Sequence, residues 1–170
     1  MSGESLYKGS DNDVTPSVPS NFETTGVVIV DHGSRRPESN AMLEQFVARF
    51  AEASPYGIVE PAHMELAEPS IDTAFDRCVQ RGAQCVAVIP YFLLPGKHWI
   101  QDIPALAATA ARRHRSIPYL VGAPIGLHPM MTQVVHARLD HCLAHAAGKA
   151  DACEACEGTG RCVMKIEDSG

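Results

Sequence analysis

The stretch Gly26-Val27-Val28-Ile29-Val30, followed directly by Asp31-His32-Gly33-Ser34-Arg35-Arg36, decides the fold of this chain. Its first half is a short, continuous run of apolar and mostly β-branched residues, which is typical of a strand buried on both faces. Its second half turns abruptly polar around a glycine, as expected where a strand ends in a loop. We therefore expect a buried strand that delivers His32 to its carboxyl end.

The residues that follow alternate between helical and strand patterns. In residues 38–53, apolar side chains recur at three- and four-residue spacing, which predicts a helix with one apolar face; they are Met42, Phe46, Val47 and Phe50. Further strands are predicted at 58–64, 85–89 and 119–123, and further helices at 69–82, 99–115 and 130–146. Four strand–helix units in series predict an α/β fold, a doubly wound parallel sheet of about four strands with helices on both faces.

Composition excludes several classes of protein. The chain has 170 residues, of which 45% are hydrophobic, so it is not wholly disordered. Its net charge of −6 argues against nucleic acid as the main partner. No apolar run approaches the roughly 18 residues that a membrane span needs, so we expect no membrane segment.

The chain divides into three parts by composition. Residues 1–24 are rich in Gly, Ser, Asp, Asn and Pro and lack apolar periodicity, so we expect a disordered tail. This tail shows no secretory signal and is not the Arg-rich, acid-poor segment of a transit peptide, so we expect any import signal to have been removed. Residues 25–148 form the predicted main domain, and residues 149–170 form a Cys-rich segment.

Histidines gather at the predicted carboxyl ends of the strands, where parallel sheets bind ligands. These histidines are His32, His63, His98 and His128. The other four are expected on helix surfaces: His114, His136, His141 and His145. Any single histidine at a strand end could equally be a structural residue held by hydrogen bonds. Their joint placement favours metal binding or proton transfer, because neutral imidazole serves in both.

Other polar residues near these ends allow two interpretations each. Glu65 lies between apolar neighbours and is either a salt-bridged structural group or a partly desolvated base. Arg35 and Arg36 stand at a helix start and either bind an anion or are ordinary solvated charges. Trp99, the only tryptophan, is either a core residue or a surface on which a flat ligand stacks.

The Cys-rich segment predicts a metal site. Cys153 and Cys156 form a C-x2-C pair, which lets two thiolates reach one metal. Cys162 follows after a short segment that contains two glycines. With Cys142 they supply four thiolates, as iron–sulfur clusters require. A zinc loop is the alternative, and Cys142 could instead be a core thiol, because it lies on the apolar stripe of helix 130–146. Cys78 and Cys85 are expected in the core.

Three motifs, in this order, resemble those of the sirohydrochlorin chelatases of the class II chelatase group. They are Val30-Asp31-His32-Gly33-Ser34-Arg35, Met64-Glu65-Leu66-Ala67-Glu68-Pro69-Ser70, and Pro95-Gly96-Lys97-His98-Trp99 with Asp102-Ile103-Pro104. The similarity covers about residues 25–162 and is greatest to the plant and algal ferrochelatases of siroheme synthesis. It implies a flavodoxin-like fold. It also implies that this chain is half of a full chelatase, so that two copies pair as a homodimer around the site.

The resemblance also implies an activity and its residues. The activity is insertion of Fe(II) into sirohydrochlorin, giving siroheme and releasing two protons, in the plastid stroma. His32 and His98 are implied as the catalytic, metal-handling pair, with Glu65 as the acidic member. The alternatives are a cobalt or nickel chelatase and a non-catalytic tetrapyrrole or metal carrier.

The charged substrate and the Cys-rich end complete these expectations. Local positive charge and helix starts are expected to bind the carboxylates of sirohydrochlorin; the residues are Ser34, Arg35, Arg36 and Lys97. A [2Fe-2S] cluster is implied on the four thiolates Cys142, Cys153, Cys156 and Cys162. Bacterial members usually carry a small residue where this chain has Asp31, which leaves open whether Asp31 accepts a hydrogen bond from His32.

Overall fold

The computed structural model describes residues 21–114 and 117–165. Most of the predicted tail, and residues 166–170, lie outside the described residues; residues 22–24 form a short 3-10 helix, Phe22–Thr24. The chain divides into two compact units, one ending at Gly126 and the other beginning at Leu127. Among the described residues, no helix has the length and apolar character needed to cross a membrane.

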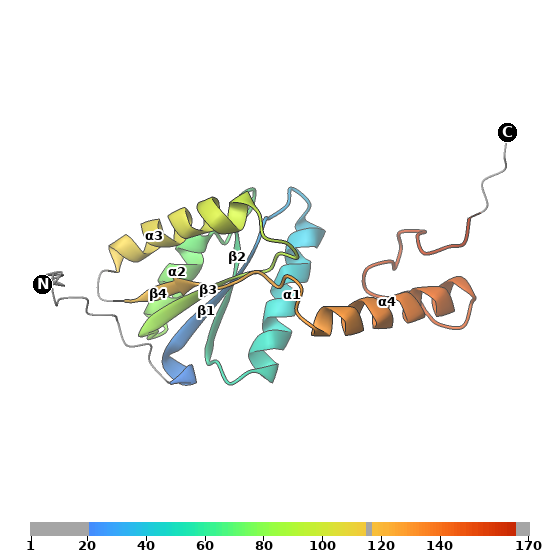
Figure 1. The fold of residues 1–170 in the computed structure, drawn as a ribbon, viewed down its shortest axis with the longest axis horizontal. Coiled ribbons are helices and arrows are strands. Elements are labelled where there is room, and N and C mark those ends of the chain that lie inside the picture. Colours follow the sequence, from blue (N-terminus) through green and yellow to red (C-terminus); the bar gives the residue numbers. More distant parts are fainter. Residues whose placement is uncertain (1–20, 115–116, 166–170) are drawn as a thin grey trace, which may run out of the picture. The chain divides into compact units, whose positions relative to one another are not determined.

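The first unit is built on a four-stranded parallel sheet (Figure 1). Its strands are β1 Thr25–Asp31, β2 Ile58–His63, β3 Cys85–Pro90 and β4 Tyr119–Val121. Their order across the sheet is β2-β1-β3-β4, so β1 has a hydrogen-bonded neighbour on each side. This confirms the predicted parallel α/β fold, and the central position of β1 explains why its sequence is continuously apolar.

Helices cover both faces of this sheet (Figure 1). They are α1 Pro37–Ala53, α2 Ile71–Gln80 and α3 Ile103–Arg113. Val28 and Val30 of β1 belong to the larger core cluster, with residues of α2 and α3 such as Phe75. Val27 and Ile29 belong to a second cluster with residues of α1. The alternation of side chains along β1 therefore feeds two cores, one on each face.

The predicted buried face of α1 is confirmed in part. Val47 is buried and Phe50 packs partly buried against the same cluster, as predicted. Met42 and Phe46 are instead 51% and 36% exposed, and Leu43, about 100° around the helix from Met42, is buried. Phe46 instead contacts the ring of Tyr91, with ring centroids 4.5 Å apart.

The helix predicted at 99–115 is shorter and begins differently. A π-helical turn, His98–Asp102, precedes α3, which ends at Arg113. Such turns are rare and occur frequently at functional sites.

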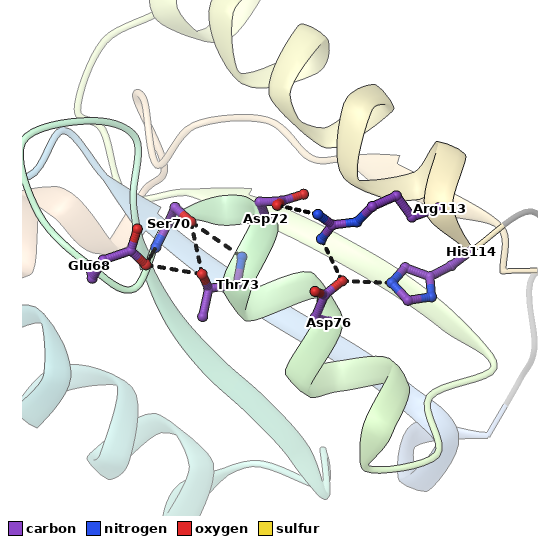
Figure 2. Close-up of polar contacts among 7 residues, drawn as sticks. All are labelled: Glu68, Ser70, Asp72, Thr73, Asp76, Arg113 and His114. Carbon is purple, nitrogen blue, oxygen red and sulfur yellow. Dashed lines mark hydrogen bonds and ion pairs between the residues drawn. The ribbon is translucent and has the colours of Figure 1, made fainter.

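Ion pairs tie α2 to α3 (Figure 2). Arg113 bonds to Asp72 and Asp76, with N···O distances of 2.6 and 2.7 Å, and Asp76 Oδ1 lies 2.7 Å from His114 Nε2. Burial raises the pKa of Asp76, but the hydrogen bonds from His114 and Arg113 outweigh burial and lower the pKa. The prediction of His114 on an exposed helix surface is wrong: it is partly buried, because it bonds Asp76 and stacks on Phe75.

The second unit consists of α4, Met130–Ala146, and the Cys-rich segment. Gly148 follows the helix end with a φ of +71°, where glycine is favoured, and Lys149 N–H bonds back to the carbonyl of Ala144 (2.8 Å). Arg138 then holds Glu154 at 2.8 Å, which keeps the Cys-rich segment beside α4. The division at residues 148 and 149 stays a prediction, since α4 groups here with the segment that follows it.

Candidate active site

The site begins where β1 and β2 end side by side. Asp31 and His63 are register partners, and the parallel hydrogen bonds continue one step beyond the strands. The N–H of Met64 donates to the carbonyl of Asp31 (2.8 Å), and the N–H of Glu65 donates to the carbonyl of His32 (3.1 Å). This extended pairing brings Glu65 beside His32, whose Nε2 lies 2.8 Å from Glu65 Oε1.

Both ring nitrogens of His32 face oxygen atoms. Nδ1 lies 3.2 Å from the carbonyl oxygen of Gly33, and Nε2 faces the Glu65 carboxylate. A carbonyl and an ionised carboxylate both accept hydrogen bonds, whereas a neutral imidazole has only one N–H. A single N–H therefore cannot serve both contacts at once, and Nε2, 2.8 Å from the carboxylate, makes the shorter of the two.

His98 completes a group of three with His32 and Glu65. Its ring centroid lies 5.2 Å from that of His32, at an interplanar angle of 73°. Its Nδ1 is 2.8 Å from Asp102 Oδ2, an arrangement that fixes the ring and leaves Nε2 available. Trp99, the next residue, is partly buried, and its indole N–H donates to the carbonyl of Gly122 (3.0 Å). Sequence reasoning missed Asp102 as a partner of His98, although their four-residue spacing at the start of the helix predicted over 99–115 was a usable signal.

Asp31 contacts His63 and the backbone of Gly33. Its Oδ1 accepts the Gly33 N–H at 2.9 Å and lies 2.6 Å from Nδ1 of His63. His63 is fully buried, and its Nε2 has no hydrogen-bond partner among the described residues. Through its hydrogen bond with the backbone N–H of Gly33, Asp31 thus stabilises the turn that contains His32.

Only glycine fits at position 33. Its φ is +82°, and a Cβ there would stand 2.0 Å from the carbonyl oxygen of Glu65 and 3.0 Å from Cβ of His63. The close approach of the two loops, and with it the contact between His32 and Glu65, depends on this missing side chain.

Two open hollows with basic side chains flank the site. One, of about 500 Å³, is lined by Glu65, His98 and Lys97 among others. The other, of about 480 Å³, is lined by Ser34 and Arg35 among others. Among the described residues, no salt bridge is formed by Arg35, Arg36 or Lys97; Arg36 lines neither hollow, and its N–H donates to the hydroxyl of Ser34 (3.1 Å).

In the second unit, the four predicted cysteine ligands lie in two pairs. The Sγ atoms of Cys153 and Cys156 are 3.6 Å apart, and those of Cys142 and Cys162 are 3.9 Å apart. The N–H of Ala155 lowers the pKa of the Cys153 thiol, whereas the hydrogen bond with Cys142 raises the pKa of the Cys162 thiol to about 11. Among the described residues, no group of three His, Cys, Asp or Glu side chains is arranged to hold a single metal ion.

The other predicted cysteines and His128 differ in burial. Cys142 is only partly buried, so it is not a core thiol, whereas Cys78 and Cys85 are buried as predicted. Burial raises the pKa of Cys78 to about 12. His128 is exposed and accepts a hydrogen bond from the N–H of Met130 (3.3 Å).

Comparison with known proteins matches a CbiX family model to residues 26–142. The chain is 56% identical over 142 residues to the chloroplastic sirohydrochlorin ferrochelatase of Arabidopsis thaliana, covering 84% of this chain and 63% of that protein. It is 35% identical over 114 residues to a sirohydrochlorin cobaltochelatase of Priestia megaterium, covering 66% of this chain and 37% of that protein.

A solved structure shares the fold. The sirohydrochlorin chelatase SirB of Bacillus subtilis subspecies spizizenii, in complex with cobalt, superposes with a TM-score of 0.66 at 33% identity. The match covers 69% of this chain and 50% of that one. The chain thus spans less than two thirds of the length of each of these relatives.

We predict that Gly33→Ala lowers the free energy of unfolding by about 2 kcal/mol or more, because the new methyl group meets a backbone carbonyl and the backbone is left-handed. Gly96→Ala is the matched control. It likewise lies in a loop beside a site histidine, two residues before His98, but nothing lies within 4 Å of its Cβ position. Urea unfolding measures both variants, and equal stability of the two would contradict the role given to Gly33.

Proposed function

The chain belongs to the CbiX family, and we propose from this premise that it is a sirohydrochlorin ferrochelatase. It inserts Fe(II) into sirohydrochlorin, gives siroheme and releases two protons. The observation that carries the proposal is the group of His32, Glu65 and His98 at the carboxyl ends of parallel strands, with His32 Nε2 2.8 Å from Glu65. The 56% identity to a plant ferrochelatase supports the choice of substrate and metal.

Among the described residues, no three His, Cys, Asp or Glu side chains are arranged to hold a metal ion, and in this proposal the iron is held only briefly and then passed on. Nε2 of His32 and the Glu65 carboxylate, 2.8 Å apart, would be its ligands on the way. The carboxylate supplies charge that attracts the dication, and imidazole ligands bind divalent iron. His98 offers its free Nε2 from the facing side of the site.

Proton removal is the second requirement of the reaction. Two pyrrole N–H groups must lose their protons as the metal enters the ring. Imidazole is a general proton acceptor, and His32 and His98 each lie 2.8 Å from a carboxylate oxygen, of Glu65 and Asp102 respectively.

The carboxylates of the substrate need local positive charge, because the chain as a whole is acidic. Arg35 and Lys97 line the two hollows beside the site and are proposed to bind them. Arg36 and Ser34 stand at the start of α1, where the Ser34 hydroxyl is already an acceptor for the Arg36 N–H. In our proposal Ser34 therefore orders the turn that presents the arginines.

A cobalt or nickel chelatase is the alternative enzyme, and the similarity to a cobaltochelatase supports it. A carrier that binds tetrapyrrole or metal without turnover is the alternative outside catalysis. Anaerobic mixing of the purified chain with sirohydrochlorin and Fe(II), Co(II) or Ni(II) in turn separates the three. Absorbance change faster than the protein-free rate identifies an enzyme, and the fastest metal identifies its type.

We predict that His32→Ala and His98→Ala each lower the rate of Fe(II) insertion roughly 10²- to 10⁴-fold, because each loses a proton acceptor at the metal site. Their melting temperatures should stay close to that of the unmodified chain, since both side chains are 43% exposed. His136→Ala is the control, because His136 is 77% exposed on α4 and should leave the rate unchanged. Near-normal insertion by both site variants would refute the assignment.

The chain is further proposed to act as a homodimer, since one small sheet domain supplies half of a two-domain chelatase site and a C2 pair is the commonest assembly. Light scattering of the purified chain should then give about twice 18.3 kDa. Full activity of a species with the mass of a single chain would contradict this.

The Cys-rich segment is proposed to bind a [2Fe-2S] cluster. Two thiolates on one tetrahedral metal at about 2.3 Å lie about 3.8 Å apart, close to the 3.6 and 3.9 Å separations of the two cysteine pairs. The cluster would supply redox or structural chemistry outside the group formed by His32, Glu65 and His98.

We predict that Cys→Ser at position 142, 153, 156 or 162 removes the brown colour and the visible charge-transfer bands, with iron content falling in step, because each change removes a thiolate ligand. Insertion activity should largely survive. Cys85→Ser is the control and should retain the colour, since Cys85 is buried in β3. If the chain purified without oxygen contains zinc and no acid-labile sulfide, the cluster proposal is wrong and the zinc loop is the correct alternative.

A plastid location is proposed with this function, because the plant relative is chloroplastic.

A further inference from the structure

Leu66, which directly follows Glu65, adopts a backbone conformation that leucine avoids. Its φ is +68°, and the only other non-glycine residue with a positive φ in the described part of the chain is Cys162. In this region Cβ crowds the backbone, and the residues that enter it are mostly Gly, Asn and Asp. The surroundings of Leu66, rather than its own preference, therefore hold it in place.

Hydrogen bonds on both sides of Leu66 impose this turn. On one side, the N–H of Glu65 donates to the carbonyl of His32 (3.1 Å). On the other, the N–H of His63 donates to the carbonyl of Pro69 (2.7 Å), so the chain returns to the strand it has just left. The reversal must fall between these two bonds, and Leu66 is where the backbone becomes left-handed.

Glu68 fastens the returning arm of the turn to the start of α2 (Figure 2). Its Oε2 accepts the N–H of Ser70 at 2.7 Å and the hydroxyl of Thr73 at 3.0 Å. The bond from the Ser70 backbone lowers the pKa of Glu68, so the carboxylate stays charged and the arm stays fixed. The turn is thus anchored by backbone and polar contacts that do not involve the leucine side chain.

The side chain of Leu66 is unfavourable in its position for a second reason. It is apolar and 52% exposed, and it lines the hollow of about 480 Å³, whose charged side chains are Arg35 and the carboxylates Glu44 and Glu68. A glycine or asparagine at this position would suit both the backbone and the solvent better. Neither the turn nor the hydrophobic core requires a leucine at this position. A ligand that packs against the side chain would account for it.

We propose that Leu66 is a substrate-contacting residue whose side chain packs against the apolar face of the flat macrocycle, while Arg35 in the same hollow meets one of its carboxylates. This inference rests on the proposed function, since it takes sirohydrochlorin as the ligand. An apolar wall beside a few convergent charges is the usual way in which proteins bind such molecules. Leu66 would set the depth at which the ring stands beside Glu65 and His32.

Two substitutions separate this contact from a purely structural role. Leu66→Ala removes the side chain and keeps the left-handed strain, whereas Leu66→Gly removes both. The Kd of metal-free sirohydrochlorin, measured by absorbance titration of the full chain, should rise about tenfold in each variant, as loss of a leucine contact predicts. Leu66→Gly should melt at a temperature no lower than the unmodified chain, since the backbone cost is gone.

Phe22→Ala is the control for loss of an exposed apolar side chain. Phe22 is 53% exposed and precedes the amino end of β1, at the opposite edge of the sheet from the site, so the Kd should not change.

Several results would overturn the inference. An unchanged Kd in both Leu66 variants would remove the contact, and a lowered melting temperature of Leu66→Gly would show that the fold needs the leucine. Loss of insertion at an unchanged Kd would show that Leu66 acts through Glu65. If the unmodified chain binds no sirohydrochlorin, both the proposed function and this inference are wrong. If the unmodified chain and both variants bind sirohydrochlorin equally well, only the role of Leu66 is wrong.

Discussion

The rest of the site depends on one constraint: the backbone pairing of β1 and β2 continues past the ends of both strands. The hydrogen bonds from Met64 to Asp31 and from Glu65 to His32 are the last steps of that pairing. They fix the two backbones beside each other. The side chains of His32 and Glu65, which are far apart in sequence, are therefore brought together by backbone hydrogen bonds. The carbonyl of Glu65 occupies the space where a side chain of residue 33 would stand, so the pairing tolerates only glycine there.

Three imidazole–carboxylate pairs follow from this edge, and they differ in exposure. In the first pair His63 is fully buried and Asp31 is 26% exposed, whereas His32 with Glu65 and His98 with Asp102 are open to solvent. The buried His63 ring suits the fixing of a loop, because water cannot replace it as the partner of Asp31. The two open pairs keep access to ions and protons, which is what metal transfer requires.

The sequence predicted the sheet, its parallel strands and the residues at their ends, because buried strands and helix starts leave strong local signals. It placed Met42 rather than Leu43 on the buried face of α1, since both are apolar and only the packed sheet chooses between them. The partner of Asp31 could not be predicted. It is set by strand register, which joins residues 32 positions apart in sequence. The turn at Leu66 was likewise hidden, because its strain comes from long-range bonds.

The second unit follows a different physical logic. In the first unit, a hydrophobic core positions the polar groups, and both β1 faces contribute to it. In the second, α4 has no buried residue, and Cys156 is the one buried hydrophobic residue in the described part of the unit. A segment with so little apolar burial gains its order from other interactions: the ion pair of Arg138 with Glu154 and the paired thiols. Exposed ion pairs contribute little, on the order of 0–1 kcal/mol, whereas metal–thiolate bonds contribute folding free energy directly. If the proposed cluster is bound, its metal–thiolate bonds would therefore supply more of the folding free energy of this unit than its ion pair does.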